Sequence, residues 1–355
     1  MGSSLLSWAR RVGAPKGVLR LIALAVGAAL VLSGCGEGAN MLDPHGTGAR
    51  DIATLFWVIL WMAVGVFVVV EGILLYAVFR FRSTAGASLP RQVQGNTPLE
   101  IAWTIVPTVV LLGVLLATFT TMKAVASPVP NALEVTVTGH QWWWEFDYHQ
   151  QGVSTAGELH IPVNTDVTLH VMSDDVVHNF WVPELDRKVQ AIPGHDNIVP
   201  IHATTIGTYH GFCAEFCGLE HALMRFDVIV QSPADYAAWL AGQQAPPTPP
   251  ATAQEKAGAT AFTAHGCPIC HQLGANKPAG FPHNGVLVRG PNLTHYGSRG
   301  IMAGGVMVNN AHDMQLWLAD PNAEKPGNLM TIFINKGTLD AQTVQNLTAY
   351  LESLK

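Results

Sequence analysis

The sequence predicts a multi-domain membrane protein with a two-helix transmembrane hairpin, a domain of short β-strands and a small helical domain. Only 12% of the 355 residues are charged, which is typical of a membrane component. Two long apolar runs come first, and a stretch of alternating apolar and polar residues follows them. A proline-rich segment then sets off the C-terminal part. A chain of this length exceeds one ordinary hydrophobic core, so we expect several domains.

Residues 1–34 have the pattern of a secretion signal. A basic start precedes a short apolar stretch at residues 21–31, and its charges are Arg10, Arg11, Lys16 and Arg20. The segment ends in Leu-Ser-Gly-Cys35, which resembles a bacterial lipobox and implies cleavage before a lipidated Cys35. An ordinary signal peptide and an extra membrane span are the alternatives, although the stretch is shorter than the ~20 residues that a span needs.

Residues 52–79 and 101–122 are each apolar and long enough to cross a hydrocarbon layer of ~30 Å as a helix. The loop between them carries Arg80, Arg82 and Arg91, and such an excess of positive charge marks the cytoplasmic side. We therefore expect a hairpin whose N-terminal and large C-terminal parts both lie outside the cytoplasm.

Two acidic residues, Glu71 and Glu100, lie within these apolar segments or at their edge. A carboxylate at membrane depth is costly, so it is a candidate functional group. For Glu100, the alternative is an acid favoured by the dipole at the start of a helix. For Glu71, we expect pairing with another subunit.

Residues 133–230 alternate with the period of half-buried β-strands, most clearly at 133–138, 158–163, 167–172 and 226–230. Several short strands separated by Asn, Asp, Gly and Pro predict a Greek-key sandwich or barrel. Trp142, Trp143 and Trp144 are adjacent, and strand side chains alternate, so they cannot all face one core. We expect at least one to be exposed or covered by a partner, with core packing for Trp143 or one other.

A metal-binding pattern, Cys-Ala-Glu-Phe-Cys-Gly-Leu-Glu-His-Ala-Leu-Met, runs from Cys213 to Met224. Thiolate, imidazole and thioether groups together favour copper. Cys213 and Cys217 supply enough sulfur to bridge two copper ions, and His221 lies in the same loop. A second histidine is needed, and His178, after a strand-like run, is the candidate. A structural zinc site is the alternative, but zinc has no use for Met224.

Residues 243–254 are rich in proline and predict an extended linker. Beyond it, Cys267-Pro-Ile-Cys270-His271 is the C-x-x-C-H pattern of c-type haem attachment. The two thiols would bind the haem covalently, and His271 would ligate its iron. A redox C-x-x-C pair is the alternative, which the following histidine disfavours. Every cysteine thus has an expected role, and none is left for a disulfide.

The loop from Cys213 to Met224 resembles the binuclear copper (CuA) loop of cytochrome c oxidase subunit II, and the family pattern extends from about residue 52 to about 231. The resemblance implies a cupredoxin-like Greek-key β-barrel whose last two strands are joined by this loop. It implies that Cys213 and Cys217 bridge the coppers and that His178 and His221 ligate one copper each. Met224 would be a weak axial ligand, and the carbonyl of Glu215 the last ligand.

The same resemblance assigns roles to residues outside the copper loop. Trp142 would be the electron entry point above the copper, and Glu100 would lie at the mouth of a proton channel into subunit I. The Glu215 carboxylate would reach a magnesium ion shared with subunit I. The family often has an aspartate two residues after Lys188, where this chain has Gln190. That difference leaves the copper ligands intact and concerns the surroundings of the magnesium.

The last domain resembles the all-α cytochrome c domains fused to bacterial oxidases. Met330, in Lys-Pro-Gly-Asn-Leu-Met, resembles their distal iron ligand, and His/Met ligation is common in cytochromes c. The family usually has proline next, whereas this chain has Thr331. Met302, Met307 and Met314 are the alternatives. Residues 340–354 have helical spacing and fit a terminal helix.

Charge differs between the two C-terminal domains. Residues 125–244 contain fourteen acids and three bases, a net charge of −11, whereas residues 250–355 contain six acids and seven bases, a net charge of +1. An acidic domain beside a nearly neutral one is compatible with docking. A solvated acidic face is the alternative.

These resemblances imply the electron-input subunit of a bacterial proton-pumping cytochrome c oxidase. Electrons would pass from a c-type haem to the copper pair and on to subunit I, which reduces oxygen to water. Subunit I, subunit III, the membrane and an upstream donor (a cytochrome c or a quinol-oxidising complex) are the expected partners, and no nucleic acid is expected. The expected location is the bacterial inner membrane, with the copper and haem domains on its outer face.

Two other functions remain open on the sequence: the copper-bearing subunit of a nitric oxide reductase, and a free-standing membrane electron carrier. A quinol oxidase subunit would lack the copper cysteines that are present here. The expected division of the chain is a signal at 1–34, an external segment at 35–51, the hairpin at 52–123, the copper domain at 124–242, the linker at 243–254 and the cytochrome domain at 255–355.

Overall fold

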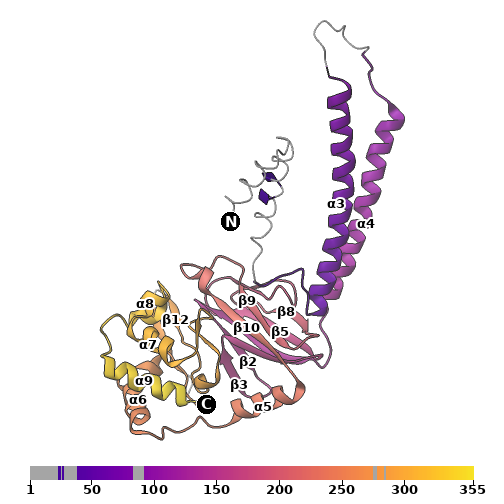
Figure 1. The fold of residues 1–355 in the computed structure, drawn as a ribbon. Coiled ribbons are helices and arrows are strands. Elements are labelled where there is room, and N and C mark those ends of the chain that lie inside the picture. Colours follow the sequence, from indigo (N-terminus) through magenta and orange to yellow (C-terminus); the bar gives the residue numbers. More distant parts are fainter. Residues whose placement is uncertain (1–22, 25, 28–37, 83–91, 275–277, 284) are drawn as a thin grey trace, which may run out of the picture. The chain divides into compact units, whose positions relative to one another are not determined.

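The structure is a computed structural model that describes residues 23, 24, 26, 27, 38–82, 92–274, 278–283 and 285–355 (Figure 1). The expected lipidation site, Cys35, lies outside the described residues, as do the basic residues of the signal and Arg91. Ala39–Lys355 form one compact unit, which contains the hairpin and both C-terminal domains.

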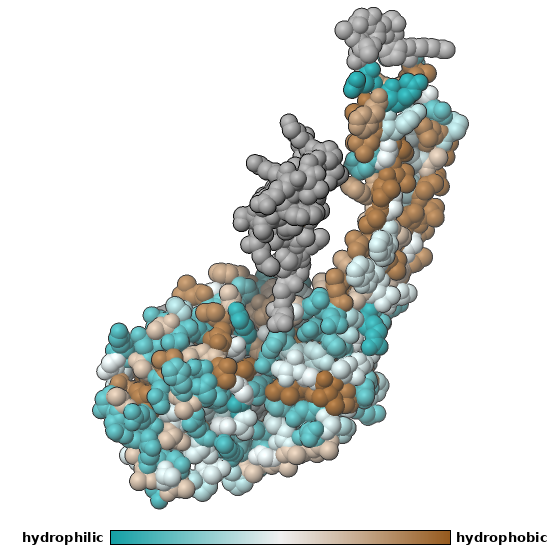
Figure 2. All heavy atoms as spheres, in the orientation of Figure 1, coloured by the Kyte–Doolittle hydropathy of each residue, from teal (hydrophilic) through white to brown (hydrophobic). Residues whose placement is uncertain are grey.

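Two long helices, α3 (Thr47–Arg80) and α4 (Thr97–Ala126), form the expected hairpin. Both are long and apolar enough to cross a membrane, and no residue of their most apolar windows is buried within the structure. Figure 2 shows the hydrophobic side chains covering the hairpin, while hydrophilic ones predominate on the rest of this face. Such a surface is suited to lipid or to another membrane subunit.

The base of the hairpin is held to the β-domain by backbone hydrogen bonds. His45 N donates to Glu184 O at 2.7 Å, and Ala49 N donates to Leu185 O at 3.1 Å. From the other helix, Val125 O accepts from Arg187 Nε at 3.3 Å. The external ends of both membrane helices are therefore fixed to the domain that carries the metal-binding loop.

The middle domain is a sandwich of two five-stranded sheets, with strand orders β3-β2-β1-β5-β8 and β4-β10-β9-β6-β7. Neighbouring strands are antiparallel except for the pairs β1 with β5 and β4 with β10. The strands are β1 (Leu133–His140), β2 (Trp143–Tyr148), β3 (Val153–Ala156), β4 (Glu158–Pro162), β5 (Asp166–Ser173), β6 (His178–Trp181), β7 (Val189–Ala191), β8 (Asn197–His202), β9 (Gly207–Cys213) and β10 (Arg225–Gln231). The four strands expected from alternation are all present.

The core of the sandwich follows from the alternating pattern. Every second residue of β1 points inward, so Val135 and Val137 are fully buried. Aromatic side chains fill the centre, where Phe180 stacks on Phe226 at a centroid distance of 4.6 Å and Trp144 meets both edge-on. A rigid aromatic core of this kind supports the strand ends from which the metal-binding loop projects.

Helix α5 (Pro233–Gln244) closes the sandwich by stacking Trp239 on His160 at 4.2 Å. Residues 245–252 then join α5 to α6 (Ala253–Ala264), so the connection is shorter than the predicted linker at 243–254. A capping box at Thr252 and Glu255 begins α6.

The last domain contains α6, α7 (Ala311–Ala319), α8 (Pro321–Glu324) and α9 (Ala341–Ser353), so the predicted terminal helix is confirmed. Helix α9 approaches α6 so closely that a Cβ on Gly258 would lie 2.0 Å from Asn346 O. The domain is not purely helical, because β11 (Phe281–His283) pairs with β12 (Val286–Val288), and β13 (Ile301–Met302) with β14 (Met307–Val308). Short 3-10 turns are η2 (Cys267–Ile269), η3 (Tyr296–Ser298) and η4 (Leu329–Ile332).

Candidate copper and haem sites

The metal-binding loop joins β9 to β10, the last two strands of the sandwich, as the resemblance implied. Strand β9 ends at Cys213 and β10 begins at Arg225, so the ligand candidates between them lie in one turn at the end of the sheet. The base of the loop is closed by the hydrogen bond from Cys213 N to Met224 O at 2.9 Å. His178 begins β6, the neighbour of β9, which brings this distant residue to the loop.

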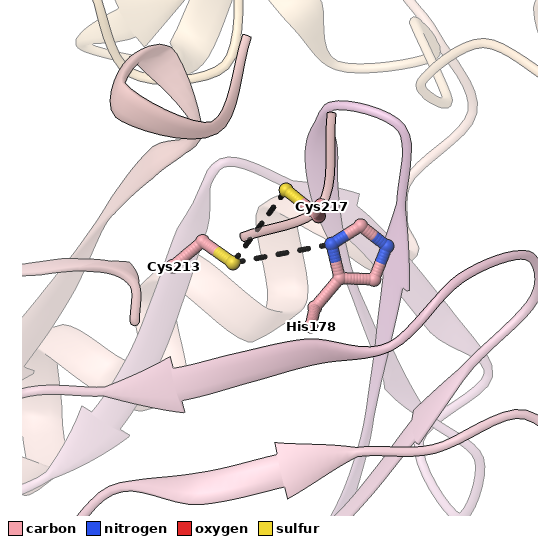
Figure 3. Close-up of side chains that lie close together, drawn as sticks. All are labelled: His178, Cys213 and Cys217. Carbon is pink, nitrogen blue, oxygen red and sulfur yellow. Dashed lines mark hydrogen bonds between the residues drawn. The ribbon is translucent and has the colours of Figure 1, made fainter. Parts of the chain in front are cut away.

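The structure brings all six candidate ligand groups into one cluster, and Figure 3 shows three of them. Cys213 Sγ lies 3.8 Å from Cys217 Sγ and 4.0 Å from His178 Nδ1. Cys217 Sγ lies 3.8 Å from His221 Nδ1 and 3.9 Å from Met224 Sδ. Glu215 O lies 3.2 Å from Cys213 Sγ. Two thiols with two imidazoles and a thioether are a soft donor set that fits copper.

Burial and charge prepare this cluster for metal binding. Cys213, Cys217, Met224 and His178 are buried. Hydrogen bonding from the Cys217 thiol lowers the pKa of Cys213, which favours the thiolate form that a metal ligand needs. His178 Nε2 contacts Asp175 Oδ1 at 2.8 Å, leaving Nδ1 directed at the thiols. A carboxylate behind a histidine in this way orients the ring toward a metal.

The Glu215 carboxylate lies beside the residue that differs from the family pattern. Gln190 Nε2 donates to Glu215 Oε2 at 3.4 Å, so an amide stands next to the acid that the resemblance assigns to magnesium. Among the described residues, the only grouping of three or more metal-binding side chains at close range is His178, Cys213 and Cys217.

The three adjacent tryptophans have three different environments. Trp144 is fully buried in the sandwich core, and Trp143 stacks on His140 at 4.3 Å. Trp142 is also buried, but its ring lies at the metal-binding loop, where Nε1 donates to Cys217 O at 3.0 Å. A Cβ on Gly218 would lie 2.9 Å from this ring, so glycine allows the close approach. Trp142 also lines a cavity formed mainly by the last domain, so the expected covering partner belongs to the chain itself.

The cavity of the last domain contains the haem-attachment residues. It has a volume of about 210 Å³, and Cys267, Cys270 and His271 line it. His271 Nδ1 donates to Pro291 O at 2.9 Å, which leaves Nε2 as the free ring nitrogen. Burial lowers the pKa of His271, so its ring is neutral and able to ligate iron. Both cysteines are free thiols, as covalent haem attachment requires.

Three methionines line the same cavity: Met302, Met314 and Met330. Met302 Sδ accepts a hydrogen bond from the Tyr296 hydroxyl at 3.2 Å, so its sulfur already has a partner. Met330 lies in the turn η4, whereas the fourth candidate, Met307, does not line the cavity. Among the described residues, none is hydrogen-bonded to the buried Arg299 Nε, and Arg299 lines the cavity. A guanidinium nitrogen with a free donor at this cavity fits a haem carboxylate.

Several polar residues between the copper and cytochrome domains were not found by sequence reasoning. Lys325 Nζ lies 3.3 Å from Glu220 Oε2 and donates to Trp142 O at 2.8 Å. Burial raises the pKa of Glu220 to about 7 and lowers that of Lys325, while their mutual attraction opposes both shifts. Glu158 accepts from Gly300 N at 2.6 Å and Ile301 N at 3.0 Å. No sequence pattern links these residues, because the partners are more than eighty positions apart.

The membrane acids occupy different settings. Glu100 lies in the first turn of α4, and its Oε1 accepts from Asn96 N at 3.1 Å. The Asn96 side chain in turn accepts from Leu99 N, so Glu100 takes part in a capping arrangement at the start of the helix. Glu71 lies in the last third of α3 and is partly buried. The capping role considered for Glu100 is thus present, and it is compatible with a second role.

The fold and the two sites define a membrane-anchored electron-transfer protein, with a cupredoxin-like domain and a cytochrome c domain in one chain. Family models agree with each part: "Cytochrome C oxidase subunit II, transmembrane domain" matches residues 37–121, "Cytochrome C oxidase subunit II, periplasmic domain" matches 152–232, and "Cytochrome c" matches 255–355.

Curated relatives match this chain over nearly its whole length. A cytochrome c oxidase subunit 2 of Alkalihalophilus pseudofirmus is 35% identical over 92% of this chain and 94% of its own length. A cytochrome c oxidase subunit 2 of Bacillus subtilis is 32% identical over 95% of this chain and 98% of its own. The chain belongs to the cytochrome c oxidase subunit II family. A solved periplasmic domain of subunit II from Bradyrhizobium japonicum is 29% identical, with 33% of this chain and 97% of that chain covered at a TM-score of 0.32.

Proposed function

We propose that this chain is the electron-input subunit of a proton-pumping cytochrome c oxidase. The observation that carries the proposal is the position of Trp142, which lines the cytochrome cavity and also donates a hydrogen bond to Cys217 O in the metal-binding loop. When bound, a c-type haem and a binuclear copper centre supply one-electron chemistry. The cytochrome domain then receives electrons, and the copper domain delivers them to subunit I, where oxygen is reduced.

We assign the copper ligands from the cluster of donor atoms. Cys213, Cys217, His178, His221, Met224 and the carbonyl of Glu215 would together hold a binuclear copper centre. Asp175 holds the His178 ring in place. A zinc site would leave Met224 without a role, although its sulfur lies 3.9 Å from Cys217 Sγ in a fully buried position.

We assign the haem to the cavity of the last domain. Cys267 and Cys270 would attach the haem covalently, and His271 and Met330 would ligate its iron. Arg299 supplies an unpaired donor for a haem carboxylate. The support for Met330 over Met302 is that the Met302 sulfur accepts a hydrogen bond from Tyr296.

Further parts of the proposal concern the membrane and the partners. The chain docks with subunits I and III in the inner membrane of a bacterium, is lipidated at Cys35, and receives electrons from a cytochrome c or a quinol-oxidising complex.

Glu100 is the entrance to a proton channel, and measuring the turnover of an oxidase that carries Glu100→Gln tests this role. The Glu215 carboxylate binds magnesium together with subunit I, since it lies in the copper loop and accepts a hydrogen bond from the Gln190 amide.

Metal analysis of the full-length chain, matured with haem and purified in detergent, tests the proposal directly. We expect two copper ions and one iron per chain. The Cys217→Ser variant should lose the binuclear copper and keep the iron, because the haem residues lie in the other domain. One zinc ion and no copper in the parent protein would refute the copper assignment, and absence of iron would refute the haem assignment.

A further inference from the structure

The contact between the two electron-transfer domains is built around a buried lysine, Lys325. It lies in the segment that leads into η4 and Met330, on the cytochrome side. Its ammonium group lies 3.3 Å from the carboxylate of Glu220, which belongs to the copper loop between Cys217 and His221. Lys325 is 3% exposed and Glu220 is 1% exposed. Lysine and glutamate are almost never so deeply buried unless they are paired.

The same lysine also contacts the backbone of the residue between the two sites. Lys325 Nζ donates to Trp142 O at 2.8 Å, while the indole of Trp142 donates to Cys217 O at 3.0 Å. The backbone carbonyl of Trp142 is thus hydrogen-bonded to the cytochrome domain, and its indole is hydrogen-bonded to the copper loop. Gly304 leaves room for this contact, because a Cβ there would lie 2.6 Å from Lys325 Nζ and 2.8 Å from Trp142 O.

The Lys325 pair differs from a second ion pair between the two domains, formed by Arg289 and Asp174. Arg289 and Asp174 also meet at 2.8 Å, but their side chains are 41% and 39% exposed. Water screens an exposed pair, so it contributes little to holding two domains together. Removing one member of a buried pair leaves an uncompensated charge inside the protein, which is strongly unfavourable. The buried pair therefore determines the seating of the cytochrome domain more than the exposed one does.

We propose that Lys325 is a positioning residue which, by binding Glu220 and the carbonyl of Trp142 together, seats the cytochrome domain with Trp142 held between the haem cavity and the copper loop. The inference deepens the proposed function and rests on it. Lys325 lines the cavity but is not one of the proposed copper or haem ligands, and it acts through Trp142 and the copper loop. The short linker keeps the domains near one another, and Lys325 selects the one arrangement that places Trp142 at both sites.

The variant Lys325→Met tests this in the full-length chain in detergent. The methionine keeps an unbranched side chain and removes the charge and the hydrogen bond. Amide hydrogen exchange should increase in the peptides that contain Trp142 and Glu220 and stay unchanged in the sandwich core. Flash-induced electron transfer from haem to copper should slow by about tenfold to a hundredfold, since a displacement of ~1 Å at a positioned group can cost that much. The optical spectra of both centres should stay the same.

Two controls separate positioning from a general loss of charge or folding. Lys336→Met removes an exposed lysine of the same domain and should leave both measurements unchanged. The double variant Lys325→Met/Glu220→Gln removes the uncompensated carboxylate, so it should fold even if the single variant does not. Compared with the parent protein, its amide hydrogens near Trp142 should still exchange faster, and electron transfer from haem to copper should still be slower. The reason is that the hydrogen bond to Trp142 O is absent.

The two readouts also separate this inference from the proposed function. If amide hydrogen exchange and the rate of electron transfer from haem to copper are the same in both Lys325 variants as in the parent protein, Lys325 does not have the proposed role. If the parent itself shows no transfer from haem to copper, the proposed function fails. The exchange measurement then still decides whether Lys325 holds Trp142 and the copper loop.

Discussion

At the scale of single residues, each site contains a histidine that uses one ring nitrogen in a hydrogen bond. The other ring nitrogen is then available to a metal. His178 gives one ring nitrogen to Asp175 and directs the other at Cys213, and His271 gives Nδ1 to Pro291 O. Hydrogen bonds of this kind determine which nitrogen is available to a metal. The same reasoning applies to the methionines, since the sulfur of Met302 already accepts a hydrogen bond from Tyr296.

We therefore predict that Met330→Ala converts a six-coordinate low-spin haem to one with an open or substituted position. The sulfur-to-iron charge-transfer band of the oxidised protein should disappear, and the iron content should stay the same because Cys267 and Cys270 are intact. Optical spectroscopy of the purified chain makes this measurement. Met314→Ala is the matched control, since Met314 lines the same cavity. A band lost in that variant and kept in Met330→Ala would transfer the assignment to Met314.

At the scale of elements, the hairpin and the sandwich meet at a buried carboxylate. Asp186 is 4% exposed and lies against the first turn of α3, where a Cβ on Gly48 would overlap its carboxylate. Its Oδ1 accepts from Arg187 N at 2.6 Å. Burial raises the pKa of Asp186 to about 7, and the interaction with Arg187 offsets only part of that effect. The contact between α3 and the copper domain is therefore most stable when the Asp186 carboxyl is protonated.

This predicts a specific pH dependence of stability. Because the folded state binds the proton more tightly, the stabilising contribution is complete below about pH 4 and is lost as the pH rises through about 7. A pKa difference of about three units between the folded and unfolded states corresponds to at most ~4 kcal/mol in the free energy of unfolding. Asp186→Asn should therefore remove part of the decrease in unfolding temperature between pH 5 and pH 8, measured on the full-length chain in detergent. The exposed acid Glu324 supplies the control, Glu324→Gln. An unchanged pH dependence in Asp186→Asn would contradict the prediction.

At the scale of the whole molecule, the cytochrome domain covers the surface around Trp142 that would otherwise receive an external donor. Trp142 is only 7% exposed and lines the cavity of the neighbouring domain. A tether as short as residues 245–252 also gives an effective concentration on the order of millimolar. Electron delivery to the copper domain is thus expected to be intramolecular and nearly independent of salt.

A truncation after Gln244, at the end of α5, should reverse this behaviour. It exposes Trp142 and Glu220 on a domain of net charge −11, so an added basic cytochrome c should reduce the copper. That reaction should slow steeply with salt, because the Debye length falls from ~30 Å at 0.01 M to ~8 Å at 0.15 M. Stopped-flow reduction of copper at several salt concentrations measures it. A full-length chain whose transfer rate depends equally on salt, or on protein concentration, would refute intramolecular delivery.

The sequence by itself determined the order of the domains and the type of chemistry in each. Two apolar runs predict a hairpin because a membrane helix must satisfy its backbone internally, and alternation predicts strands because their side chains have a period of two. The copper candidates Cys213, Cys217, His221 and Met224 lie within twelve residues, and the haem candidates Cys267, Cys270 and His271 lie within five. Their short spacing in the sequence is therefore enough to predict the type of site. The structure agrees with the predicted helices and strands, and the family comparisons agree with the architecture.

Only the tertiary structure decided what depends on contacts between distant segments. His178 reaches the copper loop because β6 pairs with β9, and Trp144, rather than Trp143, packs at the centre of the core. The Lys325–Glu220 pair joins residues 105 positions apart, and no local pattern encodes such a pair. Its burial, its contact with Trp142 and the raised pKa of Asp186 all arise from exclusion of water between packed elements. Water exclusion is a property of the assembled fold, so these features became visible only in three dimensions.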